Sequence, residues 1–189
     1  MKKMFLRRWL NTRGYGVHSP FAYTFLHDVI KQKIPYYAYN ELKKSRCADA
    51  ANTIQEDELL FRIANFAQPK SIIVPAEWKG CTEYLSAGCK SAKIDVTANQ
   101  NIAHTIEKQD SLGIVCFDHP QTFVDTEQLL LRKTSEQTIC VIKNLSHTPE
   151  VWNNILQDDR VNVLFDLRTW GILFFQLEIN TRYILYNCF

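Results

Sequence analysis

The clearest pattern in the sequence is a series of short apolar runs from residue 71 onward. The runs are rich in β-branched and aromatic side chains, which is typical of buried strands. The runs that we predict to be strands are Ser71–Pro75, Lys93–Thr97, Leu112–Phe117, Thr138–Ile142, Val161–Phe165, Trp170–Gln176 and Arg182–Tyr186.

Helices are expected in the gaps between the first five runs, near residues 81–88, 100–108, 122–132 and 148–157. Such alternation predicts a mostly parallel sheet with helices on both faces, so the predicted fold class is α/β. The last two runs differ, because a parallel crossover needs about a dozen residues and far fewer separate them. We expect them to form an antiparallel hairpin at the sheet edge, where two copies of the chain could pair as a homodimer.

Helical patterns also precede the first strand. Ser19 and Pro20 predict the start of an amphipathic helix that continues to Gln32, because serine caps a helix and proline suits its first turn. A second short helix is expected over residues 40–48 and a third over residues 56–67.

Charge is unevenly distributed along the chain. The net charge is +2, but residues 1–46 carry ten Lys and Arg against two acidic residues, whereas the remainder carries twelve against eighteen. We therefore predict a basic helical N-terminal arm over residues 1–55, packed on an α/β domain over residues 56–189. A basic arm can attract nucleic acid or another anionic partner. The commoner outcome, which we expect here, is that the arm docks on its own domain.

Composition narrows the class of protein further. Hydrophobic residues make up 46% of the chain and charged residues 22%, which is typical of a globular protein. No apolar stretch reaches the roughly 20 residues of a membrane-spanning helix, and Arg7 and Arg8 interrupt the run that a signal peptide needs. The six cysteines form no C-x-x-C pair, and Cys116 and Cys140 lie within apolar runs. We expect a cytoplasmic protein with reduced, buried thiols.

Three segments carry a resemblance to a known family. The chain opens with G-V-H-S-P-F at residues 16–21, continues with a tyrosine-rich turn at residues 36–39, and ends its sheet with an acidic residue followed by G-I-L-F-F at residues 166–175. Over nearly its full length it resembles Bacteroidetes-type class I S-adenosylmethionine-dependent methyltransferase-like proteins. The resemblance implies the Rossmann-like class I methyltransferase fold and S-adenosylmethionine as the cofactor.

The resemblance assigns a cofactor role to the loop after the first strand. In the family this strand ends in an acidic residue and a glycine-rich loop, whose bare backbone receives the methionine part of the cofactor. The corresponding segment here is Val74–Gly80, so Ala76, Glu77 and Gly80 are the candidate contacts. The segment departs from the family pattern, since a valine replaces the acid and Ala76 replaces the first glycine.

The next three strand ends supply the other candidates. The family's second strand ends in an acid that binds the cofactor ribose, where this chain has Ala98 and then Asn99. Its third strand ends in an acid that is present here as Asp118, and the fourth is followed by Lys143 and Asn144. In metal-using O-methyltransferases these last positions hold Mg²⁺. Because lysine leaves two oxygen ligands at most, we predict no metal.

Asp118, Lys143 and Asn144 are thus the candidate catalytic residues, with Asp118 also a cofactor contact. Lys143 would be a base if it were desolvated. A plain ion pair with Asp118 is the simpler expectation, and Asp118 is alternatively a helix cap. His18 either closes the pocket or anchors a local turn. We expect the tyrosine cluster to pack the arm on the domain through Tyr36, Tyr37 and Tyr39.

Three functions stay open on the sequence. The first is methyl transfer from S-adenosylmethionine to an oxygen or nitrogen of an unknown small molecule. The second is a catalytically inactive pseudo-methyltransferase that acts as a binding or scaffold protein, with Trp78 and Pro75 filling the cofactor site. The third is an anion-binding module built on residues 1–46. A crevice that is open above Ala76, Gly80, Asn99 and Asp118 would favour the first function, and a crevice plugged by Trp78 would favour the second.

Overall fold

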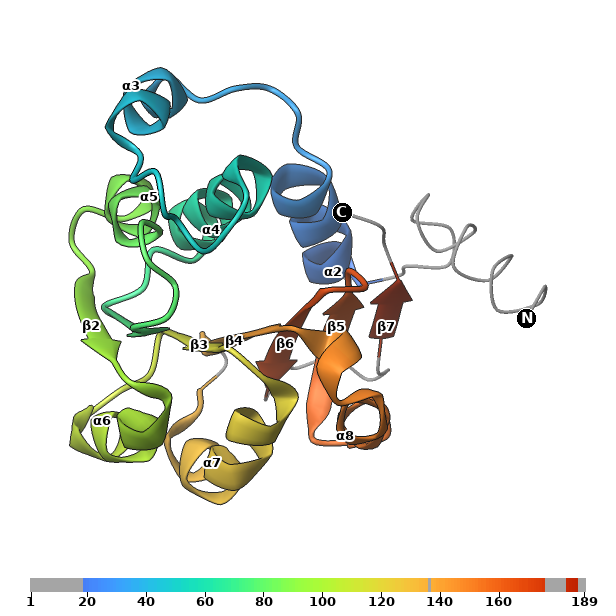
Figure 1. Cartoon of the computed structure of the whole chain (residues 1–189). Helices are drawn as coiled ribbons and strands as arrows, with labels where there is room; N and C mark the ends of the chain where they lie inside the picture. The colour runs from blue at the N-terminus through green and yellow to red at the C-terminus, as the bar shows by residue number, and fades with distance from the viewer. Residues whose placement is uncertain (1–18, 136, 176–182, 187–189) are drawn as a thin grey trace.

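The computed structural model describes residues 19–135, 137–175 and 183–186. Its centre is a seven-stranded sheet between two layers of helices (Figure 1), which confirms the predicted α/β fold class. The described strands are β1 (Ser71–Pro75), β2 (Lys93–Thr97), β3 (Ile114–Phe117), β4 (Ile139–Lys143), β5 (Val161–Asp166), β6 (Trp170–Phe175) and β7 (Tyr183–Tyr186).

The strand order corrects one prediction. The order is β2-β1-β3-β4-β6-β5-β7, and β6 runs antiparallel to both of its neighbours while the other pairs are parallel. The predicted hairpin between the last two strands is therefore wrong, because β5 lies between them and Val163 of β5 pairs with Tyr183 of β7. All six residues of β6 are buried, so this strand needs cover on both faces and takes a place inside the sheet.

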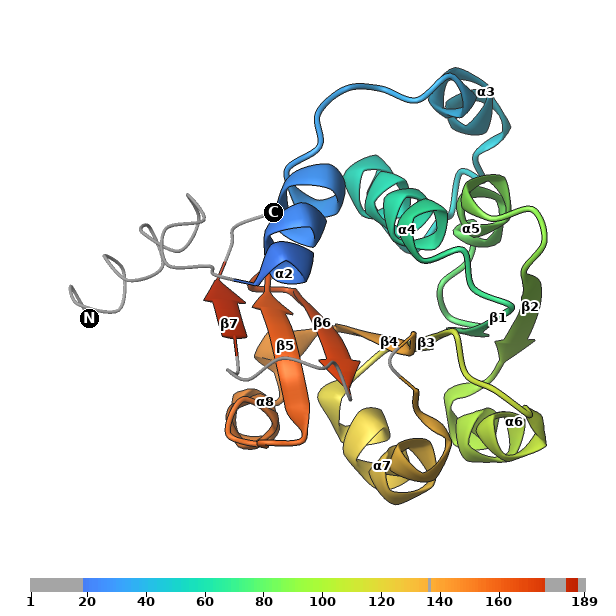
Figure 2. The same ribbon diagram turned by 180° about the vertical axis from the view of Figure 1, so that it is seen from behind.

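The helices divide between the two faces, as Figures 1 and 2 show from opposite sides. One layer holds α2 (Pro20–Phe25), the π-helical turn η1 (Leu26–Ile30), α3 (Ala38–Ser45), α4 (Ile54–Ala67) and α5 (Thr82–Gly88). The other layer holds α6 (Ile102–Lys108), α7 (Pro120–Lys133) and α8 (Pro149–Ile155). Two short 3₁₀ turns, η2 (Asn99–Asn101) and η3 (Leu145–His147), follow the ends of β2 and β4. Each layer buries one face of the sheet in its own apolar cluster.

Local signals explain where two of these helices begin. Ser19 Oγ accepts a hydrogen bond from the Ala22 amide at 3.2 Å, and Pro20 takes the first helical position, as the sequence predicted. Helix α4 begins with a capping box, in which Thr53 and Glu56 each bond the other's backbone amide. The predicted start near residue 56 was thus two residues late.

The segment that follows residue 19 belongs to the core of the molecule. Ala22, Phe25 and Leu26 are completely buried in the same cluster as α4 and the sheet, and the Phe25 ring lies 4.9 Å from that of Phe174 in an edge-to-face arrangement. This part of the predicted arm therefore packs against the α/β domain. The basic residues 1–18, including His18, lie outside the described residues, so the proposed division at residue 55 stays a prediction.

The tyrosine cluster packs only in part as expected. Tyr36 and Tyr39 contact Phe61 of α4, with ring centroids 4.9 Å and 5.2 Å away, and so hold α3 against the domain. Tyr37 is fully exposed, against the prediction. Cys116 and Cys140 are completely buried and unpaired, as predicted. Among the described helices, none combines the length and the apolar composition needed to cross a membrane.

Candidate functional site

The candidate residues gather at the carboxyl edge of the sheet. Strands β1, β3 and β4 are parallel, so Asp118 after β3 and Asn144 after β4 emerge on the same side. Strand β6 runs the other way, which places its first residue, Trp170, opposite Lys143 at the end of β4. In open α/β sheets, ligands bind in the crevice at this edge, most often where neighbouring connections run in opposite directions.

The loop after β1 is held by backbone hydrogen bonds to two other segments of the chain. The Ala76 amide donates to the Thr97 carbonyl at 2.8 Å, and the Lys79 carbonyl accepts from the Ala51 amide at 3.2 Å. Gly80 has a φ of +85°, and a Cβ there would lie 3.1 Å from the Cβ of Ala50. Gly80 is thus required for the turn and for close packing against the segment before α4. Glu77, the remaining loop candidate, is exposed.

Trp78 occupies the crevice at the end of β1. Its side chain is 2% exposed, and its Nε1 donates a hydrogen bond to Asp118 Oδ1 at 2.7 Å. Its ring also packs against Trp170, with centroids 5.0 Å apart and planes inclined by 45°. The indole therefore spans the space between the ends of β1 and β3 and the start of β6.

Asp118 and Asn144 are brought together, as their positions predicted. Asn144 Nδ2 donates to the Asp118 carbonyl at 3.0 Å and approaches Oδ1 at 3.4 Å. Asn144 adopts a left-handed conformation with a φ of 58°, which asparagine tolerates better than most residues. His119 Nε2 lies 3.0 Å from Asp118 Oδ2. Both oxygens of the Asp118 carboxylate are therefore engaged within the protein.

Lys143 does not pair with Asp118, and the predicted ion pair is wrong. Its Nζ donates to Asn52 Oδ1 at 2.7 Å and to the Ala51 carbonyl at 3.2 Å, and lies 3.8 Å from Glu56 Oε2. The segment before α4 reaches over the end of β4 and supplies these oxygens. They draw the ammonium toward α4.

The Lys143 ammonium also lies against two aromatic rings. It is 5.9 Å from the ring centroid of Trp78 and 5.6 Å from that of Trp170. A cation at this distance from an indole face is attracted by the electrons of the ring. The lysine and the two tryptophans therefore fill the crevice as one packed unit.

Sequence reasoning missed Trp170 of this unit and two residues that contact it, Asn52 and Glu56. Glu56 Oε1 accepts from Trp170 Nε1 at 2.7 Å, while Oε2 accepts from the Thr53 amide at 2.7 Å. The T-x-x-E spacing of the capping box was visible in the sequence. The contact with Trp170 was not, because 114 positions separate the two residues.

A buried carboxylate, that of Asp57, holds the segment before α4 in place. Asp57 is completely buried and accepts hydrogen bonds from Asn52 Nδ2 at 3.0 Å and Arg46 Nε at 3.1 Å. Burial raises the pKa of Asp57, although the bonds from Asn52 and Arg46 oppose the rise. These bonds fix Asn52, which in turn accepts from Lys143.

Asn99 lies apart from this unit. It follows β2 at the start of η2, and its Oδ1 is buried with no hydrogen-bond partner in the described part of the chain. A buried acceptor without a partner is costly and marks a position that a ligand hydroxyl could satisfy. Within the same part of the chain, no group of three or more His, Cys, Asp and Glu side chains is placed to hold a metal ion.

Comparisons with known proteins were informative at the level of structure. No protein-family model matches the sequence, and no curated protein matches it either. A Podospora anserina methyltransferase solved with bound SAH matches 85% of this chain and 97% of its own, with a TM-score of 0.58 and 10% identity. A Corynebacterium glutamicum protein matches 86% of this chain and all of its own, with a TM-score of 0.59 and 10% identity.

A third structure, the Bacillus cereus O-methyltransferase in complex with SAH, matches 82% of this chain and 96% of its own, with a TM-score of 0.53 and 11% identity. The chain thus has the Rossmann-like fold of the class I methyltransferases. At this level of identity the likeness is one of fold, so the function has to be argued from the site.

Proposed function

We propose that this chain is a catalytically inactive protein of the methyltransferase fold, which acts as a binding or scaffold protein. The observation that carries the proposal is the position of Trp78. Its indole is buried in the crevice at the carboxyl edge of the sheet and is hydrogen-bonded to Asp118, the one family acid retained at these strand ends.

The residues present do not fit the methionine end of S-adenosylmethionine, the cofactor implied by the fold. That end of the cofactor needs an open loop backbone after the first strand. Here the loop packs on Ala50 and Ala51, and Trp78 stands in the space above it. A bound cofactor would have to displace an indole that is packed against Trp170, and would leave Asp118 without one of its donors.

Lys143, the candidate base, is also bound to other groups of the protein. The side chain of Lys143 is 13% exposed, and its ammonium donates to Asn52 and Ala51 beside the carboxylate of Glu56. An ammonium has no lone pair with which to accept a substrate proton. Lys143 therefore acts in this proposal as a structural cation that joins β4 to α4.

Methyl transfer to a small-molecule oxygen or nitrogen is a second candidate, which one specific observation favours. The unpartnered Oδ1 of Asn99 lies one residue after Ala98, the position that the family resemblance aligns with the acid that binds the ribose. A ribose hydroxyl would satisfy this acceptor. The candidate requires Trp78 to leave the crevice, which breaks its hydrogen bond to Asp118 and separates it from Trp170.

Calorimetric titration of the cofactor-stripped protein with S-adenosylmethionine and S-adenosylhomocysteine separates the two candidates. We expect no binding by the wild-type protein up to about 1 mM ligand. Trp78→Ala removes the plug and is expected to gain weak binding, while Trp78→Phe keeps a ring in the crevice and is the matched control. Circular dichroism verifies that both variants are folded. Micromolar binding by the wild-type protein would overturn the proposal and redirect work to substrate screening.

A further inference from the structure

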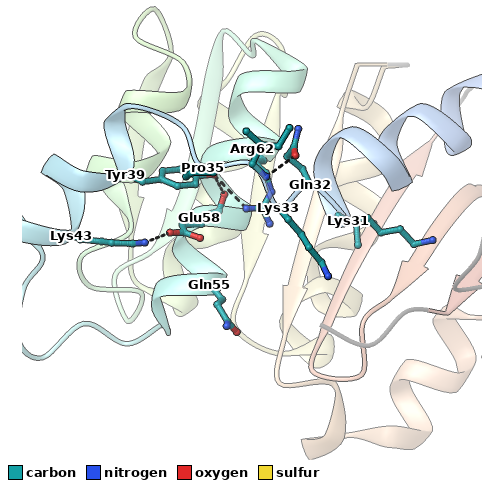
Figure 3. A pocket seen from close by; sticks show the side chains of 11 residues that line it. Lys31, Gln32, Lys33, Pro35, Tyr39, Lys43, Gln55, Glu58 and Arg62 are labelled. Carbon is teal, nitrogen blue, oxygen red and sulfur yellow. Dashed lines mark hydrogen bonds and ion pairs between the residues drawn. The ribbon is translucent and has the colours of Figure 1, made fainter.

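A second concave site lies on the outer side of α4, away from the crevice. It is a pocket of about 810 Å³, formed by the end of η1, the loop of residues 31–35, α3 and the outward face of α4 (Figure 3). This volume is within the usual range of small-molecule sites. None of the residues that fill the crevice lines this pocket.

The floor of the pocket holds a buried cation, Arg62. The residue is 6% exposed, and its Nε donates to the Val29 carbonyl at 2.6 Å while Nη1 donates to the Tyr39 hydroxyl at 3.4 Å. In the described ranges no carboxylate lies within ion-pair distance of its guanidinium group. A buried charge without an opposite charge is costly, and a bound anion would offset that cost.

The charges around Arg62 indicate how much negative charge the pocket would take. Lys43 Nζ lies 2.8 Å from Glu58 Oε1, so these two charges compensate each other (Figure 3). Lys33, which is exposed at the rim, has no ion-pair partner among the described residues. Lys31 also lines the pocket, but its side chain points away from Arg62 (Figure 3), so Arg62 and Lys33 leave two positive charges for a ligand. A phosphate monoester carries about −1.5 to −2 charges near neutral pH and matches this pair.

The pocket also offers apolar surface beside these charges. Ile34 is 72% exposed at the rim, and Ile30 and Pro35 line the wall next to it. Exposed apolar surface beside a charged anchor suits a ligand that has an organic group attached to its anion. The guanidinium supplies planar, directional donors for the phosphate oxygens, and the lysine supplies a point charge.

We infer that this pocket binds a small organic phosphate monoester, with Arg62 as the buried anchor, Lys33 as the rim cation and Ile34 beside the organic group. The inference goes beyond the proposed function, because it concerns a different site and does not depend on whether the crevice accepts a cofactor. It gives the binding role a ligand class.

Calorimetric titration with phenyl phosphate tests the inference on the full chain. We expect a dissociation constant below about 1 mM, and no binding of phenol, which shares the ring but is neutral near pH 7. Replacing Arg62 also removes its bond to Val29 and can disturb the fold, so the rim residue is the better target. Lys33→Gln is expected to weaken binding about tenfold. Lys44→Gln removes the same charge from a neighbouring exposed residue that does not line the pocket, and should leave binding unchanged.

The outcomes are distinguishable from those for the crevice. Absence of phenyl phosphate binding at about 10 mM, or equal losses in the Lys33 and Lys44 variants, would overturn the inference. Competition between phenyl phosphate and S-adenosylhomocysteine would also overturn it, because it would place the phosphate in the crevice. Cofactor binding without such competition would overturn only the proposed function and leave the phosphate site intact.

Discussion

The indole nitrogen of Trp78 lies 2.7 Å from Oδ1 of Asp118, although 40 positions separate the two residues. The bond joins the loop after β1 to the end of β3. Hydrogen bonds to a charged group contribute about 1.5–3 kcal/mol. Trp78, which fills the crevice, is therefore held in place by Asp118, the candidate catalytic residue.

Replacing Trp78 should reduce the free energy of unfolding in two distinguishable steps. Trp78→Phe keeps most of the packing against Trp170 and loses the bond to Asp118, so we expect a loss of about 2 kcal/mol. Trp78→Ala also leaves a cavity, and we expect a loss of about 3–5 kcal/mol. Urea unfolding measures both. A Trp78→Phe variant as stable as the wild-type protein would show that the bond to Asp118 contributes nothing.

Much of the fold could be predicted because the strands are short and strongly apolar. Strands β1 and β2 were predicted to the residue. Strand β1 is buried throughout and reads as a continuous apolar run, whereas β2 lies at the sheet edge and was recognised from its β-branched residues at alternate positions. The predicted hairpin between the last two strands was wrong because it was based only on the short loop that connects them. The run of residues 170–175 is apolar on both faces, which is the property of a strand inside a sheet, and this signal placed β6 between β4 and β5.

For the candidate site, the sequence predicted the residues at the strand ends but not their partners from distant segments. Asp118 and Asn144 were expected at neighbouring strand ends and are in contact there. The partners of Lys143 were not predicted, because Asn52 is 91 positions away and lies on a segment whose path over the sheet has no local signature. An aspartate is the obvious partner for a lysine in sequence, but the packing of α4 decided which acid came closest.

Replacing Glu56 should lower the stability more than replacing its exposed neighbour at the start of α4. Glu56 caps the helix, accepts from Trp170 and lies near Lys143, so Glu56→Ala is expected to lower the free energy of unfolding by about 2–3 kcal/mol. Glu56→Gln keeps only one of the two acceptor oxygens and turns its amide nitrogen toward the other donor, so we expect an intermediate loss of about 1–2 kcal/mol. Gln55→Ala, at the adjacent exposed position, is the control and should stay within about 0.5 kcal/mol. Equal effects of the two alanine variants in urea unfolding would contradict the role of Glu56.

Thiol labelling should find one reactive cysteine among those described. Cys47 is exposed, whereas Cys81, Cys89, Cys116 and Cys140 are buried. Burial raises the pKa of Cys81 to about 12 and also raises that of Cys116, so neither forms a reactive thiolate near neutral pH.

The experiment is a time course with a thiol-specific reagent in a Cys188→Ser background, because Cys188 lies outside the described residues. We expect a single fast thiol that Cys47→Ser abolishes, and the remaining thiols only after denaturation. A second fast thiol in the folded protein would show that the helical layer over the sheet opens readily.

The stability of the protein should fall in acid partly through Asp158. Burial alone would raise the pKa of this carboxyl, but hydrogen bonds from the side chain and the amide of Arg160 outweigh it and lower the pKa from 3.8 to about 2. The unfolded chain therefore binds a proton more readily than the folded one. The stabilisation is present above about pH 4 and is lost as the pH falls toward 2.

Asp158→Asn should remove this contribution. Because the partner Arg160 is about half exposed, screening by solvent reduces the expected loss to about 1 kcal/mol at neutral pH, and the difference from the wild-type protein should close as the pH approaches about 2. Asp110→Asn, at an exposed position without a described partner, is the control and should show no such convergence. Urea unfolding at a series of pH values gives both curves. A difference that is constant with pH, or that widens in acid, would mean that Arg160 does not hold Asp158 in its charged form.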